Sequence, residues 1–224
     1  STMSKPVLAY WDIRGLAEPV RLMLQHSGVN YEDKRYVCGD APDYDRSSWT
    51  NVKNTIGLDF ANLPYYIDGD VKLTESFAIM KYIGRKNGLV PVTEEEMYRA
   101  DMSEGVISDF RKSFTMMCYM PDHEKRKANF FDQLPGKLVL FEKFLNEKTW
   151  LAGDKLTYVD FAMCEILDHI CMMEPTSLDK HEKVKKYYEK FFKLEKVAEY
   201  RKSSAFKKLP VNNKMANWGG KQIC

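Results

Sequence analysis

The chain changes character near residue 90, and this change limits its fold more than any other feature of the sequence. Before that point, short apolar runs alternate with stretches of helical periodicity; after it, strand signals disappear and apolar residues recur at helical spacing. With 224 residues, the chain has room for one large or two small domains. We therefore predict two domains, an α/β domain over residues 3–90 and an all-helical domain over residues 91–224.

The first 90 residues predict the order β-α-β, a long connection, and then β-β-α. Pro19 fits the first turn of the first helix, and Gly28 follows its end. An Asp-Gly turn at residues 68–69 joins two strands into a hairpin, and Ser76 is the expected N-cap of the next helix. The expected strands lie near residues 7–10, 31–37, 63–67 and 71–74, with a polar connection over 38–58. This order is typical of a thioredoxin-like α/β layer.

Four long stretches of helical spacing fill the second half. They cover residues 94–119, 123–145, 158–173 and 181–201. Thr157 immediately precedes the third stretch and Asp160 stands three residues later, which is the spacing of a capping box. We interpret this pair as structural.

The charge balance excludes several classes of protein. Lys and Arg number 34 against 32 Asp and Glu, whereas a nucleic-acid binder normally has a concentrated basic excess. No apolar run reaches the roughly 18–20 residues that span a bilayer, and the first residues lack a hydrophobic signal core. We therefore expect no membrane or nucleic-acid partner. The cysteines and histidines of the sequence are Cys38, Cys118, Cys164, Cys171, Cys224, His26, His123, His169 and His181. Because they lack metal-ligand spacing and the cysteines form no CxxC pair, we expect no metal site and no disulfide framework. We therefore expect a cytoplasmic protein.

Three features of the first half suggest a binding site. A cis peptide at Leu63-Pro64 would leave the backbone N–H and C=O of Leu63 free to pair with an extended ligand. The helix start at Ser76 favours a carboxylate. The long connection adds two cations and an indole donor, Arg46, Lys53 and Trp49. Residues 1–90 contain 11 basic and 11 acidic side chains, so affinity for an acidic peptide must come from placed groups and not from bulk charge.

Nine segments together carry a resemblance to a known family. They begin with Tyr-Trp-Asp-Ile-Arg-Gly-Leu at residues 10–16 and continue at 35–36, 41–47, 57–60, 62–65, 67–69, 152–155, 157–161 and 214–218. The Gly-Asp-Ala-Pro insertion at residues 39–42 is typical of one class. From residue 7 to 218 the chain resembles the mu class of cytosolic glutathione S-transferases.

The resemblance implies an enzyme that adds the glutathione thiolate to apolar electrophiles, with Tyr10 as the catalytic residue. A thiol with a pKa near ~8.5 is only about 3% ionised at pH 7, and lowering that pKa by ~2 units needs about 2.7 kcal/mol of preferential stabilisation. The Tyr10 O–H would supply much of it by pointing at the sulfur. The alternative for Tyr10 is a core tyrosine at a strand end; Trp11 and the Ile-Arg-Gly that follows favour the catalytic role.

The resemblance also implies which residues bind glutathione as co-substrate, with no permanently bound cofactor. These are Tyr10, Trp11, Arg46, Trp49, Lys53, Asn62, Leu63, Glu75, Ser76 and Asp109, the last reaching toward the γ-glutamyl amine in the partner subunit. The chain departs from the family at Glu75, where mu enzymes usually carry Gln. A carboxylate there could pair with the γ-glutamyl ammonium and alter the pH dependence of binding.

The electrophile wall implied by the resemblance consists of Ile13, Leu16, Arg111, Lys112, Thr115, Tyr119 and Asn212. Tyr119 matches a tyrosine that can donate a proton to epoxides or enones; its alternative is a core tyrosine. Asn212 and Asn213 stand where mu enzymes often place an aromatic or apolar residue followed by Ser, which predicts a wetter pocket. Cys118 has no evident base beside it, and a buried, inert thiol is favoured.

Phe60 matches the apolar key that mu subunits insert into a neighbour, which implies a homodimer. Its alternative is a ring buried within its own subunit. A second functional hypothesis is a ligandin-type carrier of apolar compounds that does not act as a catalyst. Retention of Tyr10 and of the Arg46, Trp49 and Lys53 set favours the enzyme.

Overall fold

A four-stranded mixed sheet forms the centre of the N-terminal half. The computed structural model describes residues 4–221, and the strands are β1 (Val7–Trp11), β2 (Glu32–Tyr36), β3 (Tyr65–Asp68) and β4 (Val71–Thr74) in the order β2-β1-β3-β4. β1 pairs parallel with β2 and antiparallel with β3. The predicted β-α-β and β-β-α units and the hairpin are therefore confirmed.

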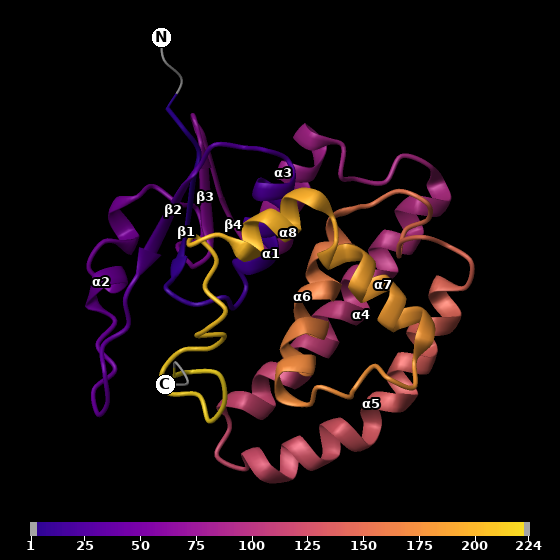
Figure 1. The fold of residues 1–224 in the computed structure, drawn as a ribbon. Coiled ribbons are helices and arrows are strands. Elements are labelled where there is room, and N and C mark those ends of the chain that lie inside the picture. The colour runs from indigo at the N-terminus through magenta and orange to yellow at the C-terminus, as the bar shows by residue number, and fades with distance from the viewer. Residues whose placement is uncertain (1–3, 222–224) are drawn as a thin grey trace.

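Helices α1 (Glu18–His26) and α3 (Ser76–Asn87) lie on the side of the sheet that faces the rest of the molecule, and the short α2 (Ser47–Thr50) lies on the other side (Figure 1). Pro19 stands at the start of α1, as expected. The apolar face of α1 is fully buried at Val20, Leu22, Met23 and Leu24. Burial of each such side chain contributes about 1.5–3 kcal/mol, so α1 fixes the sheet against the helices that follow.

The regular elements of the remaining described chain are all helices: α4 (Glu94–Tyr119), α5 (His123–Leu145), α6 (Tyr158–Met173), α7 (Glu182–Phe192) and α8 (Glu195–Lys202). All residues of α6 from Tyr158 to Ile170 are buried, so this helix is the core of the second half. The Asp160 carboxylate at its start accepts hydrogen bonds from the N–H groups of Thr157 and Leu151. This confirms the structural interpretation of Asp160.

Three local predictions are wrong. The stretch 181–201 is two helices and not one. Val184, Tyr187 and Phe191 are buried on one face of α7. Val197 and Tyr200 of α8 are also buried, but they fall on a different face of the continued helical pattern. One straight helix could not bury both sets, since six residues from Phe191 to Val197 rotate the side chain by about two thirds of a turn.

The other two corrections concern the first half. The N-cap of α3 is Glu75 and not Ser76, which is the first helical residue. The connection over residues 38–58 is not merely a polar loop, because it contains α2 and a 3-10 turn, η1 (Lys53–Thr55). Trp49 of α2 is buried beside Tyr36 and Tyr65, and this burial is what gives the connection its structure.

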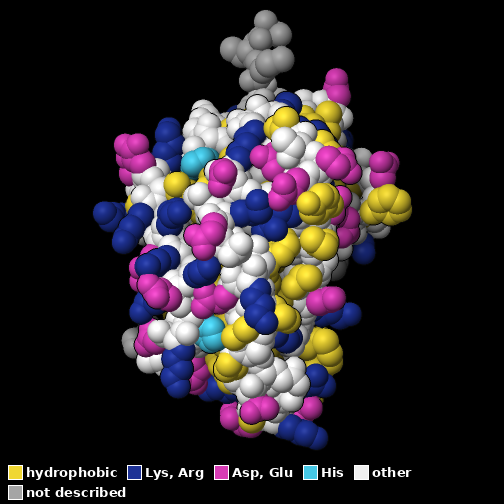
Figure 2. Space-filling view, turned by 90° about the vertical axis from the view of Figure 1, so that its right-hand side faces the viewer, with side chains coloured by type: hydrophobic (Ala, Val, Ile, Leu, Met, Phe, Trp, Pro, Cys, Tyr) yellow, Lys and Arg dark blue, Asp and Glu magenta, His cyan; other side chains and the backbone are white. Residues whose placement is uncertain are grey.

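The surface carries both signs of charge, in keeping with the near balance of the sequence. On the face seen in Figure 2, cationic and acidic side chains are interleaved, and hydrophobic side chains gather in a band toward one side. Within residues 4–221, no helix is both long enough and apolar enough to cross a bilayer.

Candidate active site

Tyr10 lies near the end of β1, where the chain turns back over its own ring. The strand register places it opposite Arg35 of β2, and the side chain is 7% exposed. Gly15 adopts φ +42° in the following loop, and a Cβ there would lie 2.6 Å from Cε1 and 2.7 Å from the hydroxyl oxygen of Tyr10. Only glycine fits so close to the phenol in this backbone conformation. The first loop, residues 12–15, therefore fixes the position of the Tyr10 hydroxyl.

The C-terminal tail, residues 207–221, holds this first loop from the other side. The N–H groups of Arg14 and Gly15 donate to the carbonyls of Pro210 and Val211 at 3.0 and 2.9 Å. Sequence reasoning missed Pro210 and Val211, because backbone hydrogen bonds between residues almost 200 positions apart leave no signal in side-chain identity.

The Arg14 side chain extends the same attachment into the helical half. It is 1% exposed and pairs with Glu165 at 2.8 Å and Asp168 at 2.6 Å, both on α6. Glu165 also lies 2.7 Å from His169. Burial opposes ionisation of Glu165, but Arg14 and His169 outweigh it and hold the pKa of this carboxyl well below its usual range. This buried network ties the first loop to the centre of the helical half.

One face of α4 points toward the first loop. Ile107, Arg111, Thr115 and Tyr119 recur every four residues and so lie in a row. A small cavity of about 30 Å³ is lined by Arg111 together with Gly15, Leu16 and Ser76. The first loop, the start of α3 and the middle of α4 thus meet, and the structure brings together predicted residues from both halves.

Tyr119 is held by the tail. Its hydroxyl oxygen accepts a hydrogen bond from the backbone N–H of Asn213 at 2.7 Å, and burial raises its pKa to about 12. The side chain is partly exposed and packs against the hydrophobic core. Because the oxygen is the acceptor in this bond, the phenol proton stays available to a ligand.

Asn212 does not make the pocket wetter in the expected way. Asn212 is only 5% exposed, and its side-chain amide donates to the carbonyl of Trp218 at 3.0 Å. Its polar group is therefore satisfied within the tail. Neighbouring Cys118 is fully buried, as predicted, and burial raises its pKa to about 12, which favours an inert thiol.

The predicted glutathione residues of the first half lie at the end of β1, in the connection after β2, in the loop before β3 and at the start of α3. Arg46 is exposed and Lys53 half-buried, and neither forms an ion pair within the described part of the chain. The Leu63-Pro64 peptide is cis, as expected. The backbone N–H of Leu63 is not free as predicted, because it donates to the Asn62 side chain at 2.9 Å.

Glu75 and Ser76 stand where β4 ends and α3 begins. Glu75 is exposed and adopts φ +69°, a conformation that residues other than glycine seldom adopt. Such strain persists only where the surrounding structure holds it, and it is concentrated at functional sites.

Trp11 is partly buried at the end of β1, next to the first loop.

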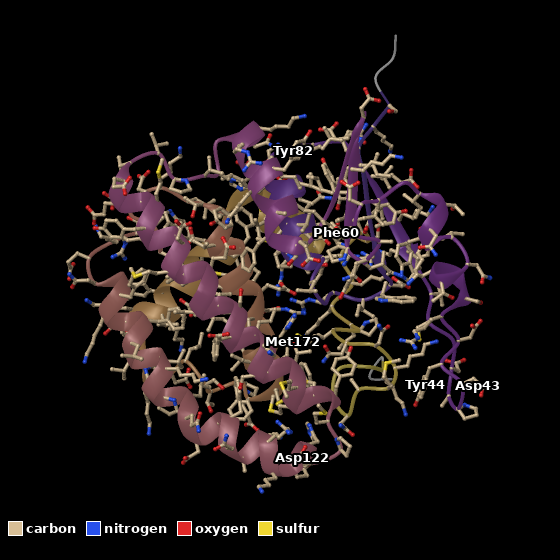
Figure 3. All side chains as sticks on the ribbon, turned by 180° about the vertical axis from the view of Figure 1, so that it is seen from behind. Asp43, Tyr44, Phe60, Tyr82, Asp122 and Met172 are labelled. Carbon is tan, nitrogen blue, oxygen red and sulfur yellow. The ribbon has the colours of Figure 1, made fainter. Side chains whose placement is uncertain are left out.

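Phe60 and Asp109 do not reach this cavity within one chain. The Phe60 ring, on the segment before β3 (Figure 3), is 77% exposed, which excludes burial within its own subunit. Asp109 lies on the outer face of α4, where it borders an apolar groove of about 410 Å³ between α4 and α5. The groove is lined by Met102, Ser103, Val106, Asp109, Phe110, Lys137, Leu140, Phe141 and Phe144.

Comparison with known proteins identifies the family. The model of the glutathione S-transferase N-terminal domain matches residues 6–85, and that of the C-terminal domain matches residues 108–204. The chain is 49% identical over 224 residues to glutathione S-transferase Mu 3 of Homo sapiens, covering 100% of both. It is 49% identical over 215 residues to glutathione S-transferase Mu 1 of Bos taurus, covering 96% of this chain and 99% of that one.

The chain belongs to the mu class of glutathione S-transferases. Solved glutathione S-transferases share its fold: the structure of Blo t 8 superposes with a TM-score of 0.88 at 35% identity, covering 95% of this chain and 99% of that one. The Pi-class glutathione S-transferase of Onchocerca volvulus gives a TM-score of 0.84 at 31% identity, with 95% and 100% covered. The mu-class prediction from the nine segments is confirmed.

Proposed function

We propose that this mu-class glutathione S-transferase conjugates the thiolate of glutathione to apolar electrophiles, with Tyr10 as the catalytic donor. The observation that carries the proposal is the Tyr10 phenol packed against Gly15, because Gly15 itself borders the cavity where the first loop, α3 and α4 meet. A fixed O–H needs no reorganisation to stabilise a developing or bound anion. Tyr10 therefore favours the thiolate of bound glutathione over the thiol and keeps the nucleophile ionised near neutral pH.

In this proposal, residues 3–90 form the glutathione-binding domain. Arg46 and Lys53, which form no ion pair within residues 4–221, and the indole of Trp49 receive the glycyl carboxylate. Trp11, Asn62 and the backbone carbonyl of Leu63 hold the middle of the peptide. Glu75 and the start of α3 at Ser76 receive the γ-glutamyl end, where the helix dipole favours its carboxylate and Glu75 attracts its ammonium. The left-handed backbone of Glu75 supports a functional role for this turn.

Residues 91–224 complete the site with the electrophile wall. Ile13 and Leu16 supply apolar contacts from the first loop, and Arg111, Thr115 and Tyr119 line the opposing face of α4. Lys112 adjoins this face, and Asn212 closes the wall from the tail. A mixed wall of this kind holds an apolar body and offers donors to a polar group on it.

We also propose a homodimer built on Phe60. An aromatic ring that is 77% exposed and an apolar groove of about 410 Å³ on the same chain are complementary surfaces. Insertion of each ring into the groove of the other subunit satisfies a twofold axis, because the same contact occurs twice. Asp109 at the edge of that groove would then approach the γ-glutamyl end of the partner's glutathione. We place the protein in the cytosol, with glutathione as co-substrate and no resident cofactor.

The decisive test is conjugation of 1-chloro-2,4-dinitrobenzene with glutathione by the purified protein. We expect turnover by the wild type and a loss of about 10²–10³-fold in kcat for Tyr10→Phe, with the dissociation constant of glutathione unchanged. Tyr98→Phe, in a half-exposed ring on α4, is the matched control. Glutathione binding without turnover by the wild type would contradict the proposal and support the carrier function.

A further inference from the structure

Arg111 is partly exposed and differs from the buried Arg14 and Arg21 in having no counter-ion among residues 4–221. Arg14 and Arg21 are 1% and 0% exposed, and each pairs with two carboxylates: Arg14 with Glu165 and Asp168, and Arg21 with Glu18 and Asp33. The ion pairs and side-chain hydrogen bonds of residues 4–221 include none at the Arg111 guanidinium, and Arg111 borders the cavity beside Gly15 and Leu16. The partial burial of Arg111 without a counter-ion lowers its pKa.

The acid beside Arg111, Glu165, does not form an ion pair with it. Glu165 borders the same cavity, but its two carboxylate oxygens accept hydrogen bonds from Arg14 at 2.8 and 3.0 Å, and the first also lies 2.7 Å from His169. The other titratable groups whose fields act on Arg111 are Tyr10, Tyr119 and Cys118, all neutral near pH 7 in their ordinary forms. The Arg111 charge is therefore available to a ligand.

The position of Arg111 assigns that ligand to the electrophile side of the site. It lies on α4 two turns before Tyr119, whose phenol proton is also available. Tyr10, the proposed partner of the sulfur, lies on the opposite wall. A ligand between Tyr10 and α4 would meet one donor at the sulfur and two donors, Arg111 and Tyr119, beyond it.

We propose that Arg111 selects electrophiles that carry a carboxylate close to the reacting carbon, such as 4-oxo-2-alkenoates. A planar guanidinium matches a carboxylate in two parallel hydrogen bonds, and the ligand supplies the counter-ion that the protein lacks. In the addition, the thiolate forms a C–S bond to one alkene carbon, the π electrons move to the ketone oxygen, and the resulting enolate takes one proton. No redox partner is needed, and the product is a thioether.

The inference rests on the proposed function, and the experiment separates the two. The probes are 4-oxo-4-phenyl-2-butenoate and its methyl ester, which share the reacting alkene and differ in charge. We expect the ratio of kcat/KM for the acid over that for the ester to fall at least about tenfold in Arg111→Met, mainly through KM. Arg111→Lys should retain most of the preference, and Arg85→Met, an exposed arginine on α3, should leave the ratio unchanged.

An unchanged acid-to-ester ratio in Arg111→Met, with the ester still turned over, would overturn the inference. A rise in the pKa of enzyme-bound glutathione in Arg111→Met, followed by the ultraviolet absorbance of the thiolate, would also overturn it, because Arg111 would then serve the sulfur. Equal thermal stability of the variant and wild type shows that the fold is intact. Failure of the wild type to conjugate 1-chloro-2,4-dinitrobenzene would instead contradict the proposed function itself.

Discussion

The backbone N–H of Asn213 donates to the hydroxyl oxygen of Tyr119 at 2.7 Å and joins the C-terminal tail to the last residue of α4. The same tail accepts hydrogen bonds from Arg14 and Gly15 of the first loop. One segment therefore sets the distance between the wall that carries Tyr10 and the wall that carries Tyr119. An ion pair from Lys214 to Asp40, at 2.7 Å, extends the tail to the long connection after β2.

Tyr119→Phe is expected to affect additions more than substitutions. Protonation of an enolate or alkoxide by a positioned acid contributes about 10²-fold or more, whereas displacement of chloride from a dinitroaryl ring needs no such proton. We expect kcat for an enone to fall about 10²-fold and that for 1-chloro-2,4-dinitrobenzene to change less than about threefold. Because burial raises the pKa of Tyr119 to about 12, the wild-type rate with the enone should not fall through deprotonation of Tyr119 between pH 6 and pH 10. Equal losses for both substrates would assign Tyr119 a purely structural role.

Glu75→Gln is expected to weaken glutathione binding near neutral pH, because the γ-glutamyl ammonium loses an opposite charge. Protonation of a carboxylate removes the same charge, so the difference between Glu75→Gln and wild type should narrow as the pH falls. Calorimetric titration of glutathione across pH measures this directly. Asp70→Gln, in the exposed hairpin turn, provides a control, and identical dissociation constants at every pH would contradict the expected role of Glu75.

Phe60→Ala is expected to dissociate the dimer. Each ring contributes roughly 1.5–3 kcal/mol when buried, and the contact occurs twice, so the dissociation constant should rise by about 10²–10⁴-fold. Sedimentation velocity over a range of protein concentrations measures the shift. Val37→Ala, at a side chain that is 58% exposed on another part of the surface, should leave the constant unchanged. A Phe60→Ala protein that sediments like the wild type at all concentrations would exclude Phe60 as the anchor.

Glu165→Gln is expected to destabilise the fold by about 3 kcal/mol near neutral pH, because it removes one of the two carboxylates that compensate buried Arg14. The folded-state pKa of Glu165 lies below its unfolded-state pKa. The stability that the Glu165 charge contributes is therefore fully present above the unfolded-state pKa and is lost as the pH falls toward the folded-state pKa. The difference from wild type should therefore shrink between about pH 5 and pH 2. Urea denaturation at fixed protein concentration measures it, with exposed Glu189→Gln as the control; a pH-independent difference would contradict this account.

Side-chain patterns predicted most of the fold and supplied the candidate residues of the site. The boundaries of α4, α5 and α6 follow from apolar spacing, and the mu-class segments identified the candidate residues. The break between α7 and α8 was missed because the charged and apolar residues near Lys193 continue a helical pattern that only the packing of Val197 and Tyr200 interrupts. The contacts of the tail were missed because backbone groups form them. The burial of Asn212 was missed because its hydrogen-bond partner is a backbone carbonyl. The missing counter-ion of Arg111 is visible only once distant acids are placed.

Gly15 has a consequence for natural variation in this protein. A single methyl group at this position would occupy the space of the Tyr10 phenol, 2.6 Å from its ring, while every residue of the proposed chemistry kept its identity. A glycine-to-alanine change would therefore look conservative in a genetic survey and still displace the group on which the nucleophile depends. Alleles that alter residue 15 should be grouped with those that alter Tyr10, whereas alleles at Thr115, in the proposed electrophile wall on α4, would change the range of electrophiles and leave the proposed sulfur site intact.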